Sequence, residues 1–218
     1  MKHGLFITLE GIDGTGKSTQ LRLLVRHLKK RGLPVRATRE PGGTKVGEQI
    51  RKILLASATT RLAPLAELAL MYAARAQHLQ EVIRPALAEG AIVVSDRYND
   101  ASLAYQGSGR KLGEETVRAF DRIVCARTQP DLTIVLDLAP SLSLQRARGR
   151  QSRRKSRQER FELQGMNFHR RVRRGYLALA RKEPRRVKVV RANGSVAEVQ
   201  GEIRKLVDAF LARRRQRF

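Results

Sequence analysis

The chain has 218 residues, 41% of them hydrophobic, so it is long enough to bury the core of one α/β domain. No apolar run approaches the roughly 20 residues that a membrane-spanning helix needs, which excludes a helical membrane protein. Because the first four residues lead directly into an apolar segment, we expect no signal peptide and a cytoplasmic location. The one cysteine, Cys125, lies in an apolar helical pattern, which favours a buried packing role over a reactive one.

Basic residues greatly outnumber acidic ones, with 45 Lys and Arg against 20 Asp and Glu and a formal net charge of +25. Residues 146–218 alone hold 24 basic and 6 acidic residues. Such a field attracts polyanions, of which nucleic acid is the obvious one. However, the chain has no Trp and only 5% aromatic residues to stack on bases, and its arginines are spread over several segments. We therefore keep nucleic-acid binding as an alternative and do not expect it to be physiological.

Strand-like and helix-like segments alternate along the chain, with no repeat or low-complexity linker between them. Apolar, β-branched runs predict strands at 5–9, 34–38, 91–95, 132–138 and 186–190. Helical spacing predicts helices at 18–30, 46–55, 62–88, 114–126, 141–148, 160–181 and 196–213. This order predicts one domain over residues 1–218: a five-stranded parallel sheet with helices on both faces. Ligands of such sheets bind beyond the carboxyl ends of the strands.

A glycine-rich loop follows the first predicted strand. Its sequence, GIDGTGKS at residues 11–18, fits the pattern G-x-x-x-x-G-K-[ST], in which backbone N–H groups surround the phosphates of a nucleotide. The helix that follows adds the positive end of its dipole. We expect Lys17 to reach the terminal phosphates of a nucleoside triphosphate and Ser18 to hold Mg²⁺. The expected ATP-binding residues are Gly11, Ile12, Asp13, Gly14, Thr15, Gly16, Lys17, Ser18 and Thr19.

Two apolar strands end in an acidic residue, the pattern that holds Mg²⁺ in phosphate-loop enzymes. These residues are Asp96 and Asp137, and position alone does not separate them. We favour Asp96 as the metal ligand because Arg97 follows it and could bridge phosphates. Asp137 is interpreted as a strand-end cap or an anchor for a lid.

Several motifs together resemble the thymidylate kinase family. They lie at residues 10–20, 38–44, 72–75, 96–98, 104–107, 130–137, 160–162 and 168–176, in family order over nearly the whole chain. The resemblance implies a three-layer fold of the P-loop NTPase type with a short basic lid. It also implies a homodimer that transfers a phosphoryl group from MgATP to dTMP, giving dTDP. Other nucleoside monophosphate kinases share the phosphate loop and not the later motifs.

The resemblance also implies roles for individual residues on the acceptor side. Asp13 matches the acid near the sugar 3′-OH and its phosphate, and Arg39 and Arg97 match the arginines that grip that phosphate. Arg75 matches the residue that hydrogen-bonds the thymine edge, and Tyr105 the tyrosine that disfavours a 2′-OH. The expected dTMP-binding residues are Asp13, Arg39, Glu40, Pro41, Met71, Arg75, Arg97, Ser102, Tyr105 and Gln106.

Four positions need comment against the family pattern. Glu40-Pro41 matches a segment that often contains a cis peptide bond. Met71 stands where the family usually has a Phe stacked on thymine, so we expect weaker stacking. Ala101 stands where a serine is common, which leaves Ser102 as the nearby hydroxyl. Glu159 replaces the usual Asp after the lid. Met71 and Ala101 leave open, as an alternative, a kinase for another nucleoside monophosphate.

The lid is expected at residues 149–158, where basic residues are dense. In this family a catalytic arginine comes from the phosphate loop or from the lid, and here the loop position holds Gly14. The resemblance therefore assigns the task to the lid, with Arg150 and Arg153 as first candidates and Arg157 next. A cation there would stabilise charge on the transferring phosphoryl group. The expected catalytic set is Lys17, Arg97, Asp13, Arg150 and Arg153.

Overall fold

Five parallel strands form a single sheet in the order β2-β3-β1-β4-β5. The computed structural model describes residues 4–56, 62–151, 160–161 and 163–215. The strands are β1 (Leu5–Glu10), β2 (Val35–Arg39), β3 (Ile92–Asp96), β4 (Leu132–Asp137) and β5 (Val187–Arg191). The first residue of each strand lies within one residue of the start of a predicted strand. The fold class predicted from the sequence is therefore confirmed, including the parallel direction and the number of strands in the described part of the chain.

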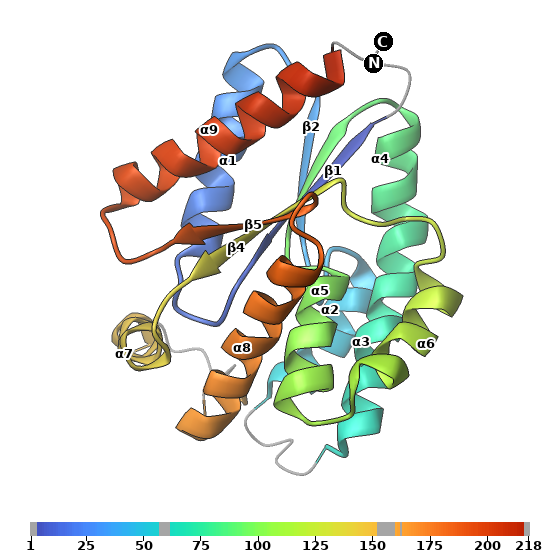
Figure 1. The fold of residues 1–218 in the computed structure, drawn as a ribbon. Coiled ribbons are helices and arrows are strands. Elements are labelled where there is room, and N and C mark those ends of the chain that lie inside the picture. The colour runs from blue at the N-terminus through green and yellow to red at the C-terminus, as the bar shows by residue number, and fades with distance from the viewer. Residues whose placement is uncertain (1–3, 57–61, 152–159, 162, 216–218) are drawn as a thin grey trace.

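Helices cover both faces of this sheet, as Figure 1 shows. One layer holds α1 (Lys17–Lys30) and α9 (Val196–Arg215), which pack against each other. The opposite layer holds α3 (Pro64–His78), α4 (Arg84–Ala88), α5 (Asn99–Ser102), α6 (Glu114–Val124) and α8 (Met166–Lys182). Helix α2 (Lys45–Leu55) packs on α3, and α7 (Pro140–Gln151) follows β4 beside α8.

The central strand β1 shows why the sheet must be covered on both sides. Its side chains alternate, so Leu5, Ile7 and Leu9 join the core cluster beneath α1 and α9. Phe6 points the other way, into the cluster beneath α3 and α6, where its ring meets that of Tyr98 edge-on at 4.8 Å. Every residue of β1 is buried, as expected for an interior parallel strand.

Two helical segments differ from the sequence prediction. The predicted helix 62–88 is interrupted by a π-helical stretch, Leu79–Ile83, just before Pro85, whose missing N–H cannot continue the regular hydrogen-bond ladder. The segment after β3 was not predicted as helical, but α5 continues into a second π-helical stretch, Leu103–Gly109. At Gly109 a Cβ would lie 2.8 Å from Phe168, so this glycine serves close packing on α8.

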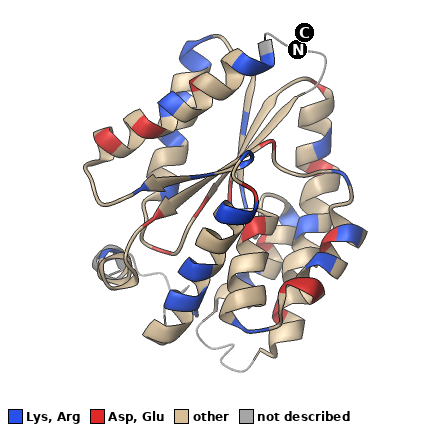
Figure 2. Ribbon diagram, in the orientation of Figure 1, with Lys and Arg blue, Asp and Glu red and all other residues tan. Residues whose placement is uncertain are grey.

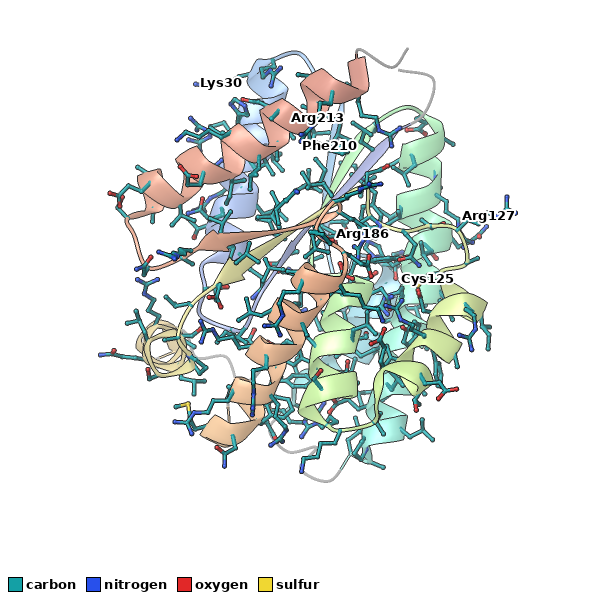
Figure 3. The ribbon with its side chains drawn as sticks, viewed as in Figure 1. Lys30, Cys125, Arg127, Arg186, Phe210 and Arg213 are labelled. Atoms are coloured by element: carbon teal, nitrogen blue, oxygen red, sulfur yellow. The ribbon has the colours of Figure 1, made fainter. Side chains whose placement is uncertain are left out.

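Helix α8 begins at Met166 rather than at the predicted residue 160. Figure 2 shows blue Lys and Arg segments on both helical layers, with no red segment on α8. Cys125, labelled in Figure 3, is fully buried, which agrees with the packing role expected for it. Within the described residues, no helix is long and apolar enough to cross a membrane.

Candidate active site

The glycine-rich loop runs from the end of β1 to the start of α1. Two glycines are required there for different reasons. Gly16, with φ of 91°, takes the left-handed conformation just before the helix begins. At Gly14, with the same φ, a Cβ would lie 1.9 Å from the carbonyl oxygen of Ser143 in α7. The loop therefore lies directly against the helix that leads to the expected lid.

Lys17 is held inside this loop. Its Nζ donates to the carbonyl oxygens of Gly11 and Ile12, each at 3.0 Å. Burial, together with the nearby charge of Arg97, lowers the pKa of Lys17 to about 8. A phosphate group would replace these carbonyl contacts with a charged partner.

The two strand-end acids have different surroundings. Asp96 accepts a hydrogen bond from the Ser18 hydroxyl, with Oγ 2.8 Å from Oδ2. Asp137 instead forms a double hydrogen bond with Arg173 of α8, at 2.7 and 2.8 Å. Asp137 is therefore occupied by a structural ion pair, whereas Asp96 faces the loop. A hydroxyl and a carboxylate are oxygen ligands that suit Mg²⁺, which takes one or two carboxylates plus substrate phosphates.

A cavity of about 410 Å³ opens beyond the carboxyl ends of β1 and β3. It brings together predicted residues from five separate segments of the chain. Those that line it are Asp13, Gly14, Gly16, Lys17, Ser18, Arg39, Glu40, Pro41, Met71, Arg75, Asp96, Arg97, Ser102, Tyr105 and Gln106. Gly11, Ile12, Thr15 and Thr19 do not line it. The side chain of Arg150 and all of Arg153 and Arg157 lie outside the described residues.

Arg97 is held in the cavity by three side-chain hydrogen bonds. Its guanidinium donates to Asp13 at 2.7 Å, to the Tyr105 hydroxyl at 2.9 Å and to the Tyr176 hydroxyl at 3.1 Å. Its backbone has φ of 74°, an unusual value for a residue with a side chain. Burial would raise the pKa of Asp13, but the charges of Arg97 and Lys17 hold that pKa well below its usual range. Asp13 is therefore an ionised carboxylate that can accept a hydrogen bond from a hydroxyl group.

Arg39, which also lines the cavity, is held less tightly. Its guanidinium donates to both oxygens of Glu48, at 2.9 and 3.0 Å, and its side chain is 54% exposed. An exposed pair of this kind contributes little to stability and can exchange partners. A phosphate in the cavity could compete with Glu48 for this arginine.

Arg75 and Glu40, two further cavity residues, form a buried ion pair. The Arg75 Nε donates to Glu40 at 2.8 Å, and a terminal nitrogen donates to the Tyr98 carbonyl and the Ser102 hydroxyl. His78 contacts the second Glu40 oxygen at 3.0 Å. Although burial opposes it, pairing with Arg75 lowers the pKa of Glu40. The Glu40–Pro41 peptide bond is cis, as the family resemblance implies.

Sequence reasoning gave no role to several residues that complete the site. Arg51, Leu55 and Phe161 line the cavity. Glu10, at the end of β1, accepts hydrogen bonds from the Tyr176 hydroxyl and the Tyr98 backbone N–H. Burial and the nearby charge of Asp100 raise the pKa of Glu10 to about 8. The pattern that pointed to Asp96, an acidic residue at the end of a strand, also applies to Glu10. Arg51 carries no comparable signal.

A glycine-rich loop between a central parallel strand and a helix, with an acid at the neighbouring strand end, defines a P-loop nucleotide-binding protein. The family model of thymidylate kinase matches residues 9–203. The thymidylate kinase of Symbiobacterium thermophilum is 48% identical over 210 residues, covering 96% of this chain and 95% of that protein. The thymidylate kinase of Trichlorobacter lovleyi is 49% identical over 210 residues, covering 96% and 98%.

A solved structure agrees with these sequence matches. The crystal structure of thymidylate kinase from Ehrlichia chaffeensis aligns with a TM-score of 0.76 and 31% identity, covering 94% of this chain and 99% of that one. The chain belongs to the thymidylate kinase family.

Proposed function

We propose that the cavity is where this chain transfers a phosphoryl group from MgATP to dTMP, giving dTDP and ADP. The observation that supports this most is that one cavity joins three kinds of group. The phosphate loop contributes Lys17, the segments after β1 and β3 contribute the Asp13–Arg97 pair, and the buried Arg75–Glu40 pair completes the lining. A donor triphosphate at the loop and an acceptor monophosphate at Arg97 would therefore share one cavity.

The chemistry that these residues supply is positioning and charge neutralisation. The acceptor phosphate oxygen is already anionic near neutral pH, so direct in-line transfer needs no strong general base. The two polyanions repel each other, and Lys17, Arg97 and Arg39 offset that repulsion. Asp13 and Tyr105 are assigned to the sugar of dTMP, beside the phosphate that Arg97 holds. A lid cation, Arg150 or Arg153, would complete the neutralisation of the transferring group.

Ser18 and Asp96 are the residues that would hold Mg²⁺ together with the nucleotide phosphates. Among the described residues, no group of three His, Cys, Asp or Glu side chains could hold a metal ion. The nucleotide phosphates would therefore have to supply further ligands. A bound Mg²⁺ would supply positive charge at the donor phosphates. This fits a metal that arrives with ATP, because Mg²⁺ in such sites takes much of its coordination from phosphate and water.

The remaining parts of the proposal rest on the family resemblance and on composition. We place the chain in the cytoplasm as a homodimer and treat residues 1–218 as one domain with a basic lid at 149–158. A second candidate, nucleic-acid binding, is suggested only by the +25 net charge. It predicts tight binding of DNA or RNA at physiological salt with a steep salt dependence. The kinase proposal predicts weak binding that disappears there.

A substrate panel tests the proposal. Purified protein is incubated with MgATP and, separately, dTMP, dUMP, dCMP, dAMP and dGMP, and the diphosphate formed is quantified. We expect the highest kcat/KM with dTMP. A clear preference for a different acceptor would replace dTMP in the proposal, and no diphosphate from any acceptor would reject it.

A further inference from the structure

Glu67, which the proposed mechanism does not use, lies at the centre of a buried cluster that includes Gln106, a cavity residue. We call the part of the cavity lined by Met71, Arg75 and Gln106 the base end, because these residues are assigned to the nucleobase side. Its side chain has no exposed surface. It is part of α3, one turn before Met71 and two turns before Arg75, so the three residues share one helical face. Glu67 and the cavity residues Met71 and Arg75 therefore belong to the same helix.

Three side chains from outside α3 contact the carboxylate of Glu67. The Gln106 Nε2 lies 2.7 Å from Oε1. The Nε of Arg110 donates to both oxygens, at 3.2 and 3.1 Å, and Arg160 forms an ion pair with Oε2 at 2.7 Å. Guanidinium groups can only donate, so both oxygens of Glu67 are committed as acceptors. Glu67 therefore has no proton to offer to Gln106.

This constraint fixes the orientation of the Gln106 amide. The NH₂ end must face Glu67, because the amide oxygen there would meet a carboxylate oxygen. Gln106 itself lines the cavity, and no donor within the described residues bonds its Oε1. The group left to a ligand is consequently a hydrogen-bond acceptor at the base end of the cavity.

We propose that Glu67 is a specificity-positioning residue: it locks the Gln106 amide so that the cavity presents an acceptor to the nucleobase. A ring N–H, as in thymine or uracil, satisfies that acceptor. Cytosine carries a ring nitrogen acceptor at the same position, and two acceptors facing each other leave both unpaired. This inference rests on the proposed function, since it concerns which acceptor nucleotide the kinase selects.

The Glu67→Gln variant tests this role by reversing the direction of the hydrogen bond between residue 67 and Gln106. Residue 67 would keep its oxygen toward the two arginines and turn its NH₂ toward Gln106. The Gln106 amide would then flip, placing its own NH₂ in the cavity as a donor. The best substrate pair is dUMP and dCMP, because these differ only in the hydrogen-bonding groups at one edge of the base and share the same sugar, phosphate and ring size.

We expect Glu67→Gln to lower the ratio of kcat/KM for dUMP over dCMP by about 10- to 100-fold, the usual range for one mispaired buried polar group. The double variant, which combines Glu67→Gln with Gln106→Glu, should restore the ratio to within a few-fold of wild type. In that variant the new amide at position 67 donates to one oxygen of the new carboxylate at position 106, and the other oxygen again faces the base. The double variant also keeps the net charge, which provides a test if the single variant does not fold.

Asp121→Asn is the matched control. Asp121 is a largely buried carboxylate that accepts from a glutamine amide, Gln129 Nε2, at 2.9 Å, and neither residue lines the cavity. It should leave the ratio unchanged. A folded Glu67→Gln variant with the wild-type ratio would overturn the inference, as would a folded double variant that fails to restore it. Wild-type protein that makes no dTDP from dTMP would instead reject the proposed function itself.

Discussion

The phosphate end and the base end of the cavity are built in different ways. At the phosphate end, Lys17 lies in a continuous loop and Asp96 lies at a strand end, and the contacts of Arg39 are exposed. At the base end, fully buried pairs join residues far apart in the chain, Arg75 with Glu40 and Gln106 with Glu67. The first arrangement leaves cations available to incoming phosphates. The second fixes donors and acceptors before any ligand arrives, so substitutions at the two ends should have different consequences.

The largest effect is expected at the phosphate end, with Lys17→Ala. The variant should lower kcat about 100- to 1000-fold, because it removes a cation that acts on developing phosphate charge. Its unfolding free energy should change little, since the side-chain hydrogen bonds of Lys17 within the described residues go to loop carbonyls. Steady-state kinetics and thermal unfolding measure the two quantities. Near-normal turnover would remove Lys17 from the catalytic set.

At the base end, Arg75→Ala should affect stability as well as dTMP use. Removing one partner of a buried ion pair leaves Glu40 uncompensated, which costs about 3 kcal/mol and lowers Tm by roughly 10 °C. Differential scanning calorimetry checks this. The control is Arg118→Ala, which breaks a more exposed pair with Glu114 and should cost less than about 1 kcal/mol. Equal losses of stability in the two variants would contradict the claim that the buried Arg75–Glu40 pair contributes more than an exposed pair.

A smaller effect is expected from Tyr105→Phe, at the junction of the two ends. The variant loses the hydroxyl contacts with Asp13 at 3.0 Å and with Arg97 at 2.9 Å. We expect kcat/KM for dTMP to fall about tenfold, the usual range for a hydrogen bond to a charged group. The KM for ATP should not change, and it serves as the internal control. A parallel rise in the KM for ATP would place Tyr105 on the donor side instead.

The last prediction concerns the pH dependence of stability and the role of Glu10. The pKa of Glu10 rises to about 8 in the folded protein, mainly through burial, from 4.5 in the unfolded chain. Between these values the folded state holds more protons than the unfolded state, so this group's contribution to stability falls as pH rises from about 4.5 to 8. Unfolding free energies at pH 5, 6.5 and 8 should therefore decline more steeply in wild type than in Glu10→Gln. The slope cannot exceed about 1.4 kcal/mol per pH unit, the free energy carried by one proton. If unfolding free energy depended on pH equally in wild type and in Glu10→Gln, Glu10 would be ionised over the whole range from pH 5 to 8.

The sequence was most informative where function depends on local backbone geometry. The loop at 11–18, the five strands and the preference for Asp96 over Asp137 all followed from short patterns, and the fold was confirmed. The segment Asn99–Gly109 was missed because Gly107 and Gly109 lower helix propensity, while its stability comes from packing on α8.

The buried pairs could not be predicted in the same way. Nothing in the sequence joins Glu40 to Arg75, 35 residues away, or Glu67 to Arg160. Glu67 reads as an ordinary charged residue in the first turn of a helix, where acids are common for electrostatic reasons. Only the tertiary fold shows that it is buried and surrounded by donors.

A single-turnover experiment with γ-³²P-labelled ATP tests the central claim most directly. Enzyme in excess over ATP is mixed with dTMP and magnesium, quenched on the millisecond scale, and the label is followed into dTDP, inorganic phosphate and protein. The account predicts that label passes from ATP to dTDP without accumulating on the protein, and that Lys17→Ala slows that step. Label that appears in inorganic phosphate alone, with dTMP left unconverted, would contradict it.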